Sequence, residues 1–347
     1  MKPPLQLAAL ALVLSTINTQ LSTVLAQGVL TPPGAPAAGM KTLDQMYAKL
    51  DPRTAITNTS SLVTITQPGS YYLTHNLSVS SGDGIDINTN GVTVDLNGFT
   101  IASAAASATG TGILLSSGLW NISILNGFIK GGVTDNGFGV YSGSGFGNGI
   151  SYAGNQPVNT RISGVAVAGV LNYGIWLSGG YSTVVDGCTV ATAGQYGIVA
   201  STIKSCVVLD CGTIGIDGDQ VSDSRGDSNS NHGLLATTAL NCVGHSNSGY
   251  GLYATTALNC YGISGSGGGL VSQTAQNCYG YSTSGYGLYA ETALNCYGIA
   301  YGSSEGLRGT MATGCYGYSA SGTGLSVTRG NFCFGSSVSV TTKYNMP

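Results

Sequence analysis

The sequence predicts an all-β solenoid, in which short strands wind into stacked coils of nearly constant length. Three observations indicate this class: a short internal repeat, a column of cysteines with the same period, and a composition rich in glycine and poor in charge. Of the 347 residues, 55 are glycine and only 7% are charged, whereas roughly one quarter of an average globular domain is charged. The apolar fraction of 42% argues against a disordered chain.

The charge also restricts the partners of the chain. There are 11 basic and 14 acidic residues, which give a net charge of −3. Because the few basic residues form no stripe, the chain cannot follow a phosphate backbone or an anionic membrane surface. We therefore expect no nucleic-acid partner.

Residues 1–26 predict a secretory signal peptide. They carry one charge, Lys2, followed by the apolar run Leu7–Leu14, and they end at Ala26 in small and aliphatic residues. A membrane anchor would need about 20 unbroken apolar residues, and polar residues interrupt this run from Ser15 onward. We expect the protein to be secreted, either extracellular or in the cell envelope, with no membrane span after cleavage.

Two short segments precede the repeats. Residues 27–39, rich in Pro, Gly and Ala, predict a linker. Residues 40–51 predict an amphipathic helix that ends before Pro52, because apolar residues recur at helical spacing: Leu43, Met46, Tyr47 and Leu50. Open-ended solenoids need covered ends, so we expect this helix to cap a parallel β-helix over residues 52–347.

The repeat itself is clearest in the C-terminal half. From Gly197 onward a Gly-Ile or Gly-Leu dipeptide recurs every 18 residues, with a single spacing of 19. So short a period, with Gly-Ser turns and no helical spacing, indicates β-strand rungs. Upstream the spacing lengthens: Gly174 precedes Gly197 by 23 residues, and Gly84 and Gly112 are 28 apart. The extra residues must leave the coils as loops, which often build binding sites.

Cysteines follow the same period. In a coil whose rungs stack about 4.8 Å apart, one position of the repeat forms a continuous column. Disulfides are common in secreted proteins, but parallel stacking keeps the Cβ atoms farther apart than a relaxed disulfide allows. We expect buried free thiols, with disulfides as the alternative, in a ladder of eight residues: Cys188, Cys206, Cys242, Cys260, Cys278, Cys296, Cys315 and Cys333.

Strand alternation assigns side chains to the inside or the outside of the coil. If Cys260 points inward, Leu258 does so too, whereas Asn259 and Tyr261 point outward. Such outer columns stabilise solenoids as amide ladders and aromatic stacks. The alternative is an aromatic strip on which sugar rings lie. The candidate ligand-binding residues are therefore Tyr261, Tyr279, Tyr297, Tyr316, Asn259, Asn277 and Asn295.

Two segments carry a resemblance to a known family. Residues Pro68–Ile101, and the pattern Cys-x-Val followed by Gly-Ile within Cys188–Ile198, resemble secreted bacterial proteins with parallel β-helix repeats of the pectate-lyase-like superfamily. The resemblance covers roughly residues 60–340. It implies a right-handed parallel β-helix and a secreted protein.

A left-handed hexapeptide solenoid would also accommodate an 18-residue coil. That fold places aliphatic residues at every sixth position, yet Ser264 and Gln276 fall in phase with Leu252 and Leu258. We therefore predict a right-handed parallel β-helix with 18-residue rungs in the C-terminal half, longer rungs in the N-terminal half and a short N-terminal helical cap.

Charges gather in one rung of the repeat region, Gly215–Gly233, which has Ser224 in place of the ladder cysteine. Ca²⁺ takes six to eight oxygen ligands, although the spacing of the acids matches neither an EF-hand nor the calcium-binding nonapeptide. A solvated polar patch is the alternative, since the repeat position of Asp217, Asp223 and Arg225 predicts exposure to solvent. The candidate catalytic residues are Asp217, Asp219, Asp223 and Arg225, and the candidate Ca²⁺ ligands are Asp217, Asp219, Asp223 and Asp227.

Polygalacturonases carry the motifs Asn-x-Asp, Asp-Asp, Gly-His-Gly and Arg-x-Lys. This chain has Asn231-His232-Gly233 in place of the third, and it has no Asp-Asp pair or Arg-x-Lys. We therefore predict a secreted non-enzymatic β-solenoid without a cofactor, unless it binds Ca²⁺. It would be a structural or binding module that contacts polysaccharides or neighbouring envelope proteins. The alternative is a polysaccharide lyase-like enzyme, which would need the charged rung as its Ca²⁺ cluster and Arg225 as its base.

Overall fold

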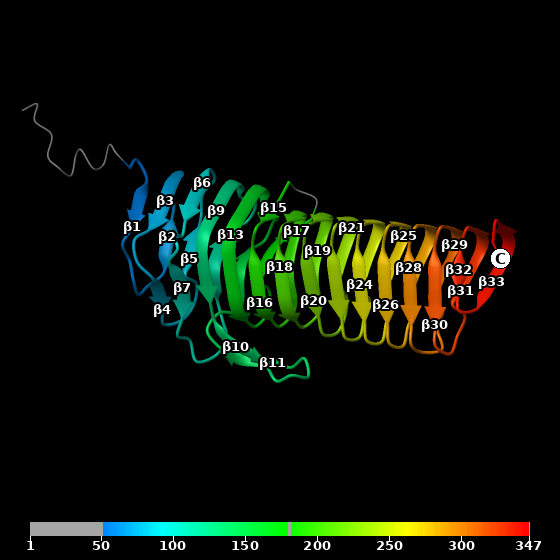
Figure 1. Cartoon of the computed structure of the whole chain (residues 1–347). Coiled ribbons are helices and arrows are strands. Elements are labelled where there is room, and N and C mark those ends of the chain that lie inside the picture. Colours follow the sequence, from blue (N-terminus) through cyan, green and yellow to red (C-terminus); the bar gives the residue numbers. More distant parts are fainter. Residues whose placement is uncertain (1–50, 180–181, 347) are drawn as a thin grey trace, which may run out of the picture. The chain divides into compact units, whose positions relative to one another are not determined.

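A computed structural model describes residues 51–179 and 182–346. The predicted signal peptide (1–26), linker (27–39) and capping helix (40–51) lie outside these residues, apart from Asp51. From Arg53 the chain forms one unit of stacked parallel strands, a parallel β-helix (Figure 1). The strands nearest the viewer in Figure 1 run downward while successive coils advance to the right, so the winding is right-handed, as predicted.

The N-terminal coils are long and irregular. Their strands are β1 (Thr54–Ile56), β2 (Val63–Ile65), β3 (Gly69–Leu73), β4 (Leu77–Val79), β5 (Ile85–Ile87), β6 (Val92–Asp95), β7 (Thr100–Ser103), β8 (Thr111–Leu115), β9 (Trp120–Lys130), β12 (Asn148–Tyr152), β13 (Val158–Val170), β14 (Ile175–Ser178), β15 (Val184–Asp186) and β16 (Thr189–Ala193). A hairpin of β10 (Gly132–Asp135) and β11 (Tyr141–Ser144) leaves the coil and pairs antiparallel.

The C-terminal coils alternate a long and a short strand. The long strands are β17 (Tyr196–Lys204), β19 (Ile214–Ser222), β21 (Leu234–Leu240), β23 (Leu252–Leu258), β25 (Leu270–Gln276), β27 (Leu288–Leu294), β29 (Leu307–Thr313), β31 (Leu325–Asn331) and β33 (Val338–Tyr344). The short strands are β18 (Val207–Cys211), β20 (Arg225–Ser228), β22 (Val243–Ser246), β24 (Tyr261–Ser264), β26 (Tyr279–Ser282), β28 (Tyr297–Ala300), β30 (Tyr316–Ser319) and β32 (Phe334–Gly335).

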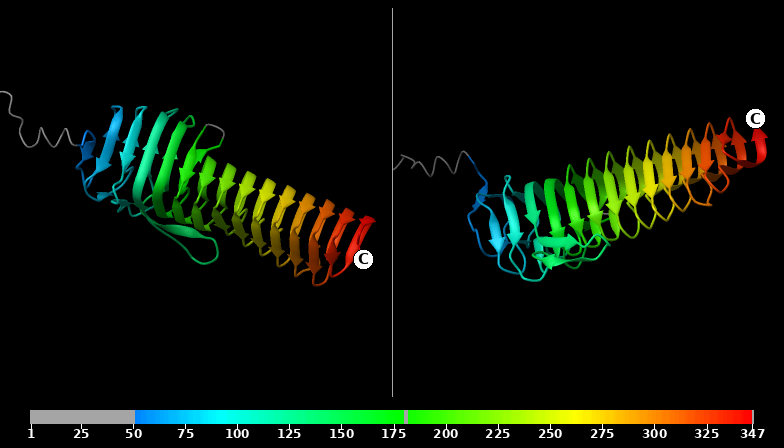
Figure 2. Two further views of the ribbon diagram at one scale, coloured as in Figure 1. Left: turned by 45° about the horizontal axis from the view of Figure 1, so that its top comes forward. Right: turned by 60° about the horizontal axis from the view of Figure 1, so that its bottom comes forward.

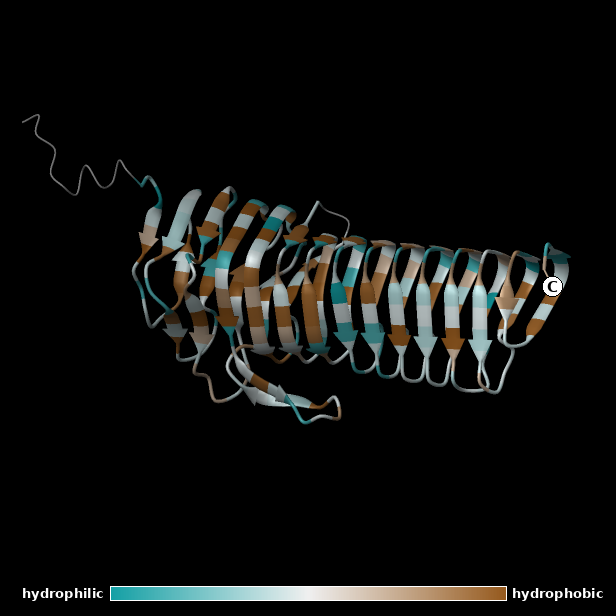
Figure 3. Ribbon diagram, in the orientation of Figure 1, coloured by the Kyte–Doolittle hydropathy of each residue, from teal (hydrophilic) through white to brown (hydrophobic). Residues whose placement is uncertain are grey.

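Each 18-residue coil has three faces. In the coil that contains β23, the long strand bends at Thr255, which is skipped in the register with the next coil. We call the side with the outer residue Tyr253 the first face, and the side with Thr256 and Leu258 the second face. The third face is β24, which shows Tyr261 and Ile263 to solvent. Figure 3 shows the resulting hydrophobic and hydrophilic bands across successive strands.

A residue in the left-handed conformation separates the second face from the third. At Asn259 φ is 53°, and Asp223, Asn241 and Asn277 have φ values of 50–55° in the same column. Asn and Asp tolerate this conformation better than most residues. The turn interrupts strand alternation, so Ala257 and Cys260 are both buried.

The inward orientation predicted for Leu258 is therefore wrong. Leu258 is half-buried on the second face, and its counterpart Leu240 is 38% exposed. The prediction assumed that inward and outward side chains alternate without a break from Leu258 to Cys260. The left-handed conformation of Asn259 breaks this alternation at the corner.

Glycine recurs because the first and third faces nearly touch inside the coil. A Cβ atom on Gly262 would overlap the carbonyl oxygen of Gly269 and lie 2.7 Å from its carbon, and one on Gly251 would overlap the backbone of Ile263. Only glycine fits at such a close approach of two backbones. The Gly-Leu dipeptide of the repeat thus combines this contact with the buried Leu252.

The interior follows the length of the coils. The 18-residue coils enclose small side chains beside the leucine column, such as Ala254, Ala257 and Cys260, whereas the longer N-terminal coils bury Ile, Val and Leu side chains and Phe146. All nine cysteines are buried and present as thiols. The Cys260 thiol donates to the Leu258 carbonyl oxygen at 3.1 Å, and the Cys278 sulfur accepts the Cys260 N–H at 3.5 Å.

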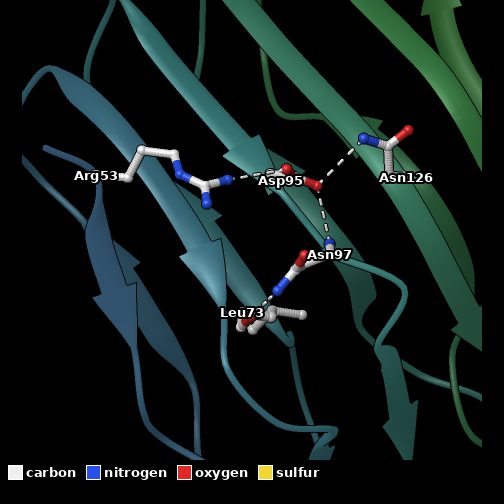
Figure 4. Close-up of polar contacts among 5 residues, drawn as sticks. All are labelled: Arg53, Leu73, Asp95, Asn97 and Asn126. Carbon is white, nitrogen blue, oxygen red and sulfur yellow. Dashed lines mark hydrogen bonds and ion pairs between the residues drawn. The ribbon is translucent and has the colours of Figure 1, made fainter. Parts of the chain in front are cut away.

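A partly buried polar network around Asp95 holds the first coil in place (Figure 4). Arg53 donates to Asp95 at 3.1 Å, and its guanidinium lies 4.4 Å from the centre of the Tyr72 ring. Asp95 also accepts the backbone N–H of Asn97 at 2.9 Å and the side-chain amide of Asn126 at 3.3 Å. Together these contacts tie the start of β1 to β6 and β9.

The β10–β11 hairpin lies along the turns of the coil (Figure 2). The Tyr141 hydroxyl donates to Asp210 at 2.8 Å and accepts from the Asn229 amide at 2.7 Å. Burial and the hydrogen bond to Asp210 raise the pKa of Tyr141, so the hydroxyl stays protonated and keeps its donor role at ordinary pH. The hairpin is thereby tied to two later coils, those that contain β18 and β20.

Candidate functional site

The structure separates the charged residues of the Gly215–Gly233 rung. Asp217 lies on the first face, and Asp219 lies at the bend that ends this face, in the position of Thr255. Asp223 occupies the corner between the second and third faces, and Arg225 and Asp227 lie on the third face. Within residues 51–179 and 182–346, no group of three His, Cys, Asp or Glu side chains comes together as metal ligands would. The four carboxylates predicted as Ca²⁺ ligands therefore do not surround one point.

Asp223 ends a ladder of corner amides. Asn241 donates to Asp223 at 3.0 Å, Asn259 donates to Asn241 at 3.1 Å, and Asn277 donates to Asn259 at 3.2 Å. All donors point toward the carboxylate, so the amide dipoles are aligned and the charge strengthens the last bond. In this ladder the corner side chains hydrogen-bond to one another along the coil axis. Asn295 has the same left-handed conformation at the next position.

Arg225 is held by its neighbour on the third face. Its Nε and Nη2 atoms donate to Asp227 at 3.1 and 2.8 Å. The hydrogen bond and charge of Asp227 raise the pKa of Arg225, which disfavours the deprotonated form that a lyase base requires. Arg225 is thus a cation paired with Asp227, and it lies on a different face from Asp217.

The predicted tyrosine column forms a continuous stack. The ring centres of Tyr261 and Tyr279 are 4.7 Å apart, those of Tyr279 and Tyr297 5.3 Å, and those of Tyr297 and Tyr316 4.7 Å, with interplanar angles of 8–23°. The rings cover one another's faces and present their edges to solvent. Sugars pack on the faces of aromatic rings, so this geometry favours the stabilising ladder over a sugar-binding strip.

A cavity of about 310 Å³ lies instead on the first face. Successive long strands β14, β17, β19 and β21 supply its floor, with Trp176, Val199, Asp217 and Leu235 in register. Asp219 completes the lining, together with Ser178, Gly179, Gly218, Ala236 and Thr237.

Asp217 and Asp219 reach this cavity together because residues two apart on a strand point to the same side. Asp217 is half-buried and Asp219 is exposed. Burial, followed by the charge of Asp219, raises the pKa of Asp217. Asp217 is therefore protonated more easily than an exposed aspartate, and both carboxyl groups can accept hydrogen bonds.

Trp176, the aromatic residue that lines this cavity, packs against two tyrosine rings. Trp176 lies 4.3 Å from Tyr173 and 5.1 Å from Tyr196 between ring centres, the second contact being edge-to-face. The Trp176 indole N–H donates to the Tyr152 hydroxyl at 3.4 Å. These aromatic residues are not among the candidates predicted from the sequence. A signal was available, because an aromatic residue precedes the Gly of the repeat dipeptide at Tyr173 and Tyr196, and again at Tyr250 and Tyr286.

Two further cavities follow along the first face. One of about 170 Å³ is lined by Tyr253, Val271, Tyr289 and Glu291 with their neighbours. The next, of about 290 Å³, is lined by Tyr250, Val271, Tyr286, Tyr289 and Arg308. The first face thus carries aromatic, apolar and acidic side chains in a row.

Comparisons with known proteins gave the following findings. No family model matches the chain, and no curated protein matches it. A search of solved structures found a polygalacturonase from Erwinia carotovora ssp. carotovora, with 11% sequence identity and a TM-score of 0.32. The match covers 85% of this chain and 96% of the polygalacturonase chain. No helix among the described residues has the length and apolarity needed to cross a membrane.

Proposed function

We propose that the protein is a polysaccharide-binding β-solenoid that holds a glycan in the cavity of its first face. The observation that carries this proposal is that Trp176, Asp217 and Asp219 line one cavity of about 310 Å³. An indole provides an apolar surface for the C–H face of a sugar ring, and carboxylates accept hydrogen bonds from sugar hydroxyls. Cavities that combine apolar walls with a few polar groups are typical of ligand sites.

The place of action follows from the N-terminal sequence. Residues 1–26 have the charge, apolar run and ending of a signal peptide, which supports a secreted protein. The glycan would then be extracellular or part of the cell envelope.

The test is retention of the mature protein on a panel of polysaccharides. We expect Trp176→Ala to weaken retention about fivefold, since one aromatic contact contributes about 1 kcal/mol. Tyr297→Ala is the matched control, because this ring belongs to the stack on the third face. If Tyr297→Ala abolishes retention while Trp176→Ala preserves it, the site is wrong.

A second function is favoured by the two carboxylates of the cavity. Glycoside hydrolysis uses a protonated carboxyl as acid and a second carboxylate as base or nucleophile, and the raised pKa of Asp217 suits the role of the acid. A lyase is less well supported, because Arg225 lies on another face and is bound to Asp227. Release of reducing ends without the absorbance of an unsaturated uronate, lost in Asp217→Asn with glycan binding retained, would establish a hydrolase and not a lyase.

A further inference from the structure

The outer column of the first face is lined by cavities without interruption. By strand register it consists of Trp176, Val199, Asp217, Leu235, Tyr253, Val271, Tyr289 and Arg308. Each of these eight residues lines at least one of the three cavities. The three cavities therefore follow one another along the coil, and we call this row of cavities the groove.

The groove is much longer than it is wide. The eight residues span seven steps between coils, about 34 Å at 4.8 Å per step. In each coil the face is only about three residues wide, roughly 10 Å. The second and third cavities share Val271 and Tyr289, and Leu235 of the first is directly paired with Tyr253 of the second. An extended ligand can contact all three cavities only if it lies parallel to the coil axis.

Aromatic side chains recur along the groove. Trp176 and Tyr253 are four coils apart, about 19 Å, and Tyr253 and Tyr289 are two coils apart, about 10 Å. Tyr253 is 42% exposed and is supported from the side by the stacked rings of His232 and Tyr250, whose centres are 5.2 Å apart. The groove thus offers three aromatic contacts to one long molecule.

The charged residues of the groove disfavour anionic glycans. Its charged lining residues are Asp217, Asp219, Glu291 and Arg308. The one cation, Arg308, donates to the Tyr286 hydroxyl at 2.9 Å and lies 3.9 Å from Glu305. A chain of uronates or sulfated sugars would therefore meet three acids and a cation that is already engaged, and like charges across an interface are unfavourable.

We propose that the groove binds a single linear, uncharged polysaccharide chain lying along the coil axis from Trp176 to Arg308, and not a polyuronate. This inference rests on the proposed function and adds to it the class of glycan, the direction of the chain and the length of the site.

The experiment measures affinity for neutral oligosaccharides of increasing length by calorimetry, with cello-, xylo-, manno- and chito-oligosaccharides as probes and polygalacturonate as the anionic probe. For the series that binds, we expect affinity to rise at least tenfold from the dimer to the longest member. Trp176→Ala and Tyr289→Ala should each weaken binding of the longest member several-fold, whereas the third-face control Tyr297→Ala should not. Far-UV circular dichroism checks that each variant is folded.

The outcomes separate the two proposals. Equal affinity for short and long members, or unchanged binding in Tyr289→Ala, refutes the continuous groove while the Trp176 site stands. Tight binding of polygalacturonate that depends on Trp176 refutes the neutral class of ligand. Absence of binding to every probe overturns the proposed function and this inference together.

Discussion

Replacing Gly262 with alanine should separate the two backbones that meet inside the coil. The added Cβ would lie 2.7 Å from the carbonyl carbon of Gly269 and 3.0 Å from the Cα atom of Leu270. Carbon atoms in contact are comfortable at about 3.5–4.0 Å, so the faces must part by roughly 0.8 Å. Both obstructing atoms belong to the backbone and cannot rotate away.

The cost follows from that geometry. Overpacking a well-packed interior costs about 1–3 kcal/mol, and the upper end applies where only backbone can move. We therefore expect Gly262→Ala to lower the free energy of unfolding by about 3 kcal/mol. Gly179→Ala is the matched control, because its Cβ would meet nothing closer than Asp219 Oδ2 at 3.7 Å.

The assay is urea unfolding followed by circular dichroism. The only tryptophans are Trp120 and Trp176, both in the N-terminal half, so fluorescence reports that half while dichroism also reports the coils around Gly262. Since repeat proteins unfold with limited cooperativity, we expect the dichroism transition to shift more than the fluorescence transition. A loss below about 1 kcal/mol, equal to that of Gly179→Ala, would refute the backbone contact as the reason for the recurrent glycine.

Four further predictions concern charge, conformation and thiols. The pKa of Asp217 is raised in the folded state, so the protonated Asp217 side chain contributes stability below about pH 4, and this contribution is lost as the pH rises through the folded-state pKa. Asp217→Asn should therefore raise the thermal midpoint more near pH 7 than at low pH. A shift of the same size at both pH values would contradict this prediction. Asp223→Ala should lower stability by about 2 kcal/mol, because it removes the acceptor of the Asn241 amide and places alanine at a φ of 50°, and Asp223→Asn should recover most of this loss in the same urea assay. Phe332 is 55% exposed with φ of 50°, so Phe332→Asn should stabilise the protein by about 1 kcal/mol, and an unchanged midpoint would speak against backbone strain there. Alkylation followed by mass spectrometry should label few thiols in the native protein and all nine after denaturation without reductant, since burial also raises the pKa of Cys211; fewer labels after denaturation would indicate disulfides.

The repeat made the fold predictable. The 18-residue period, the cysteine column and the recurrent glycine each reflect a position that looks the same in every coil, and parallel stacking converts such a period into columns. Cys260 lies inside the coil as this reasoning requires. The orientation of Leu258 was not predictable from alternation alone, because it depends on the sign of φ at Asn259. The recurrence of Asn at that corner was the available signal.

The candidate site was harder to predict. Asp217 and Asp219 were identified from their charge, but Asp223, Arg225 and Asp227 follow them closely in sequence and still lie elsewhere around the coil. Trp176 joins the site through coils of unequal length. Its alignment with Val199 and Asp217 depends on how many residues leave as loops, which the local sequence does not specify.

The register between coils also determines how the molecule carries force. Nearly all backbone hydrogen bonds between strands run from one coil to the next, along the axis. Tension applied at the two ends therefore loads these bonds in series and peels coils off one at a time, whereas a load across the axis is shared by many coils in parallel. The solenoid therefore resists tension along its axis weakly and resists bending across its axis strongly. A ligand that contacts several coils at once would hold them together under axial tension.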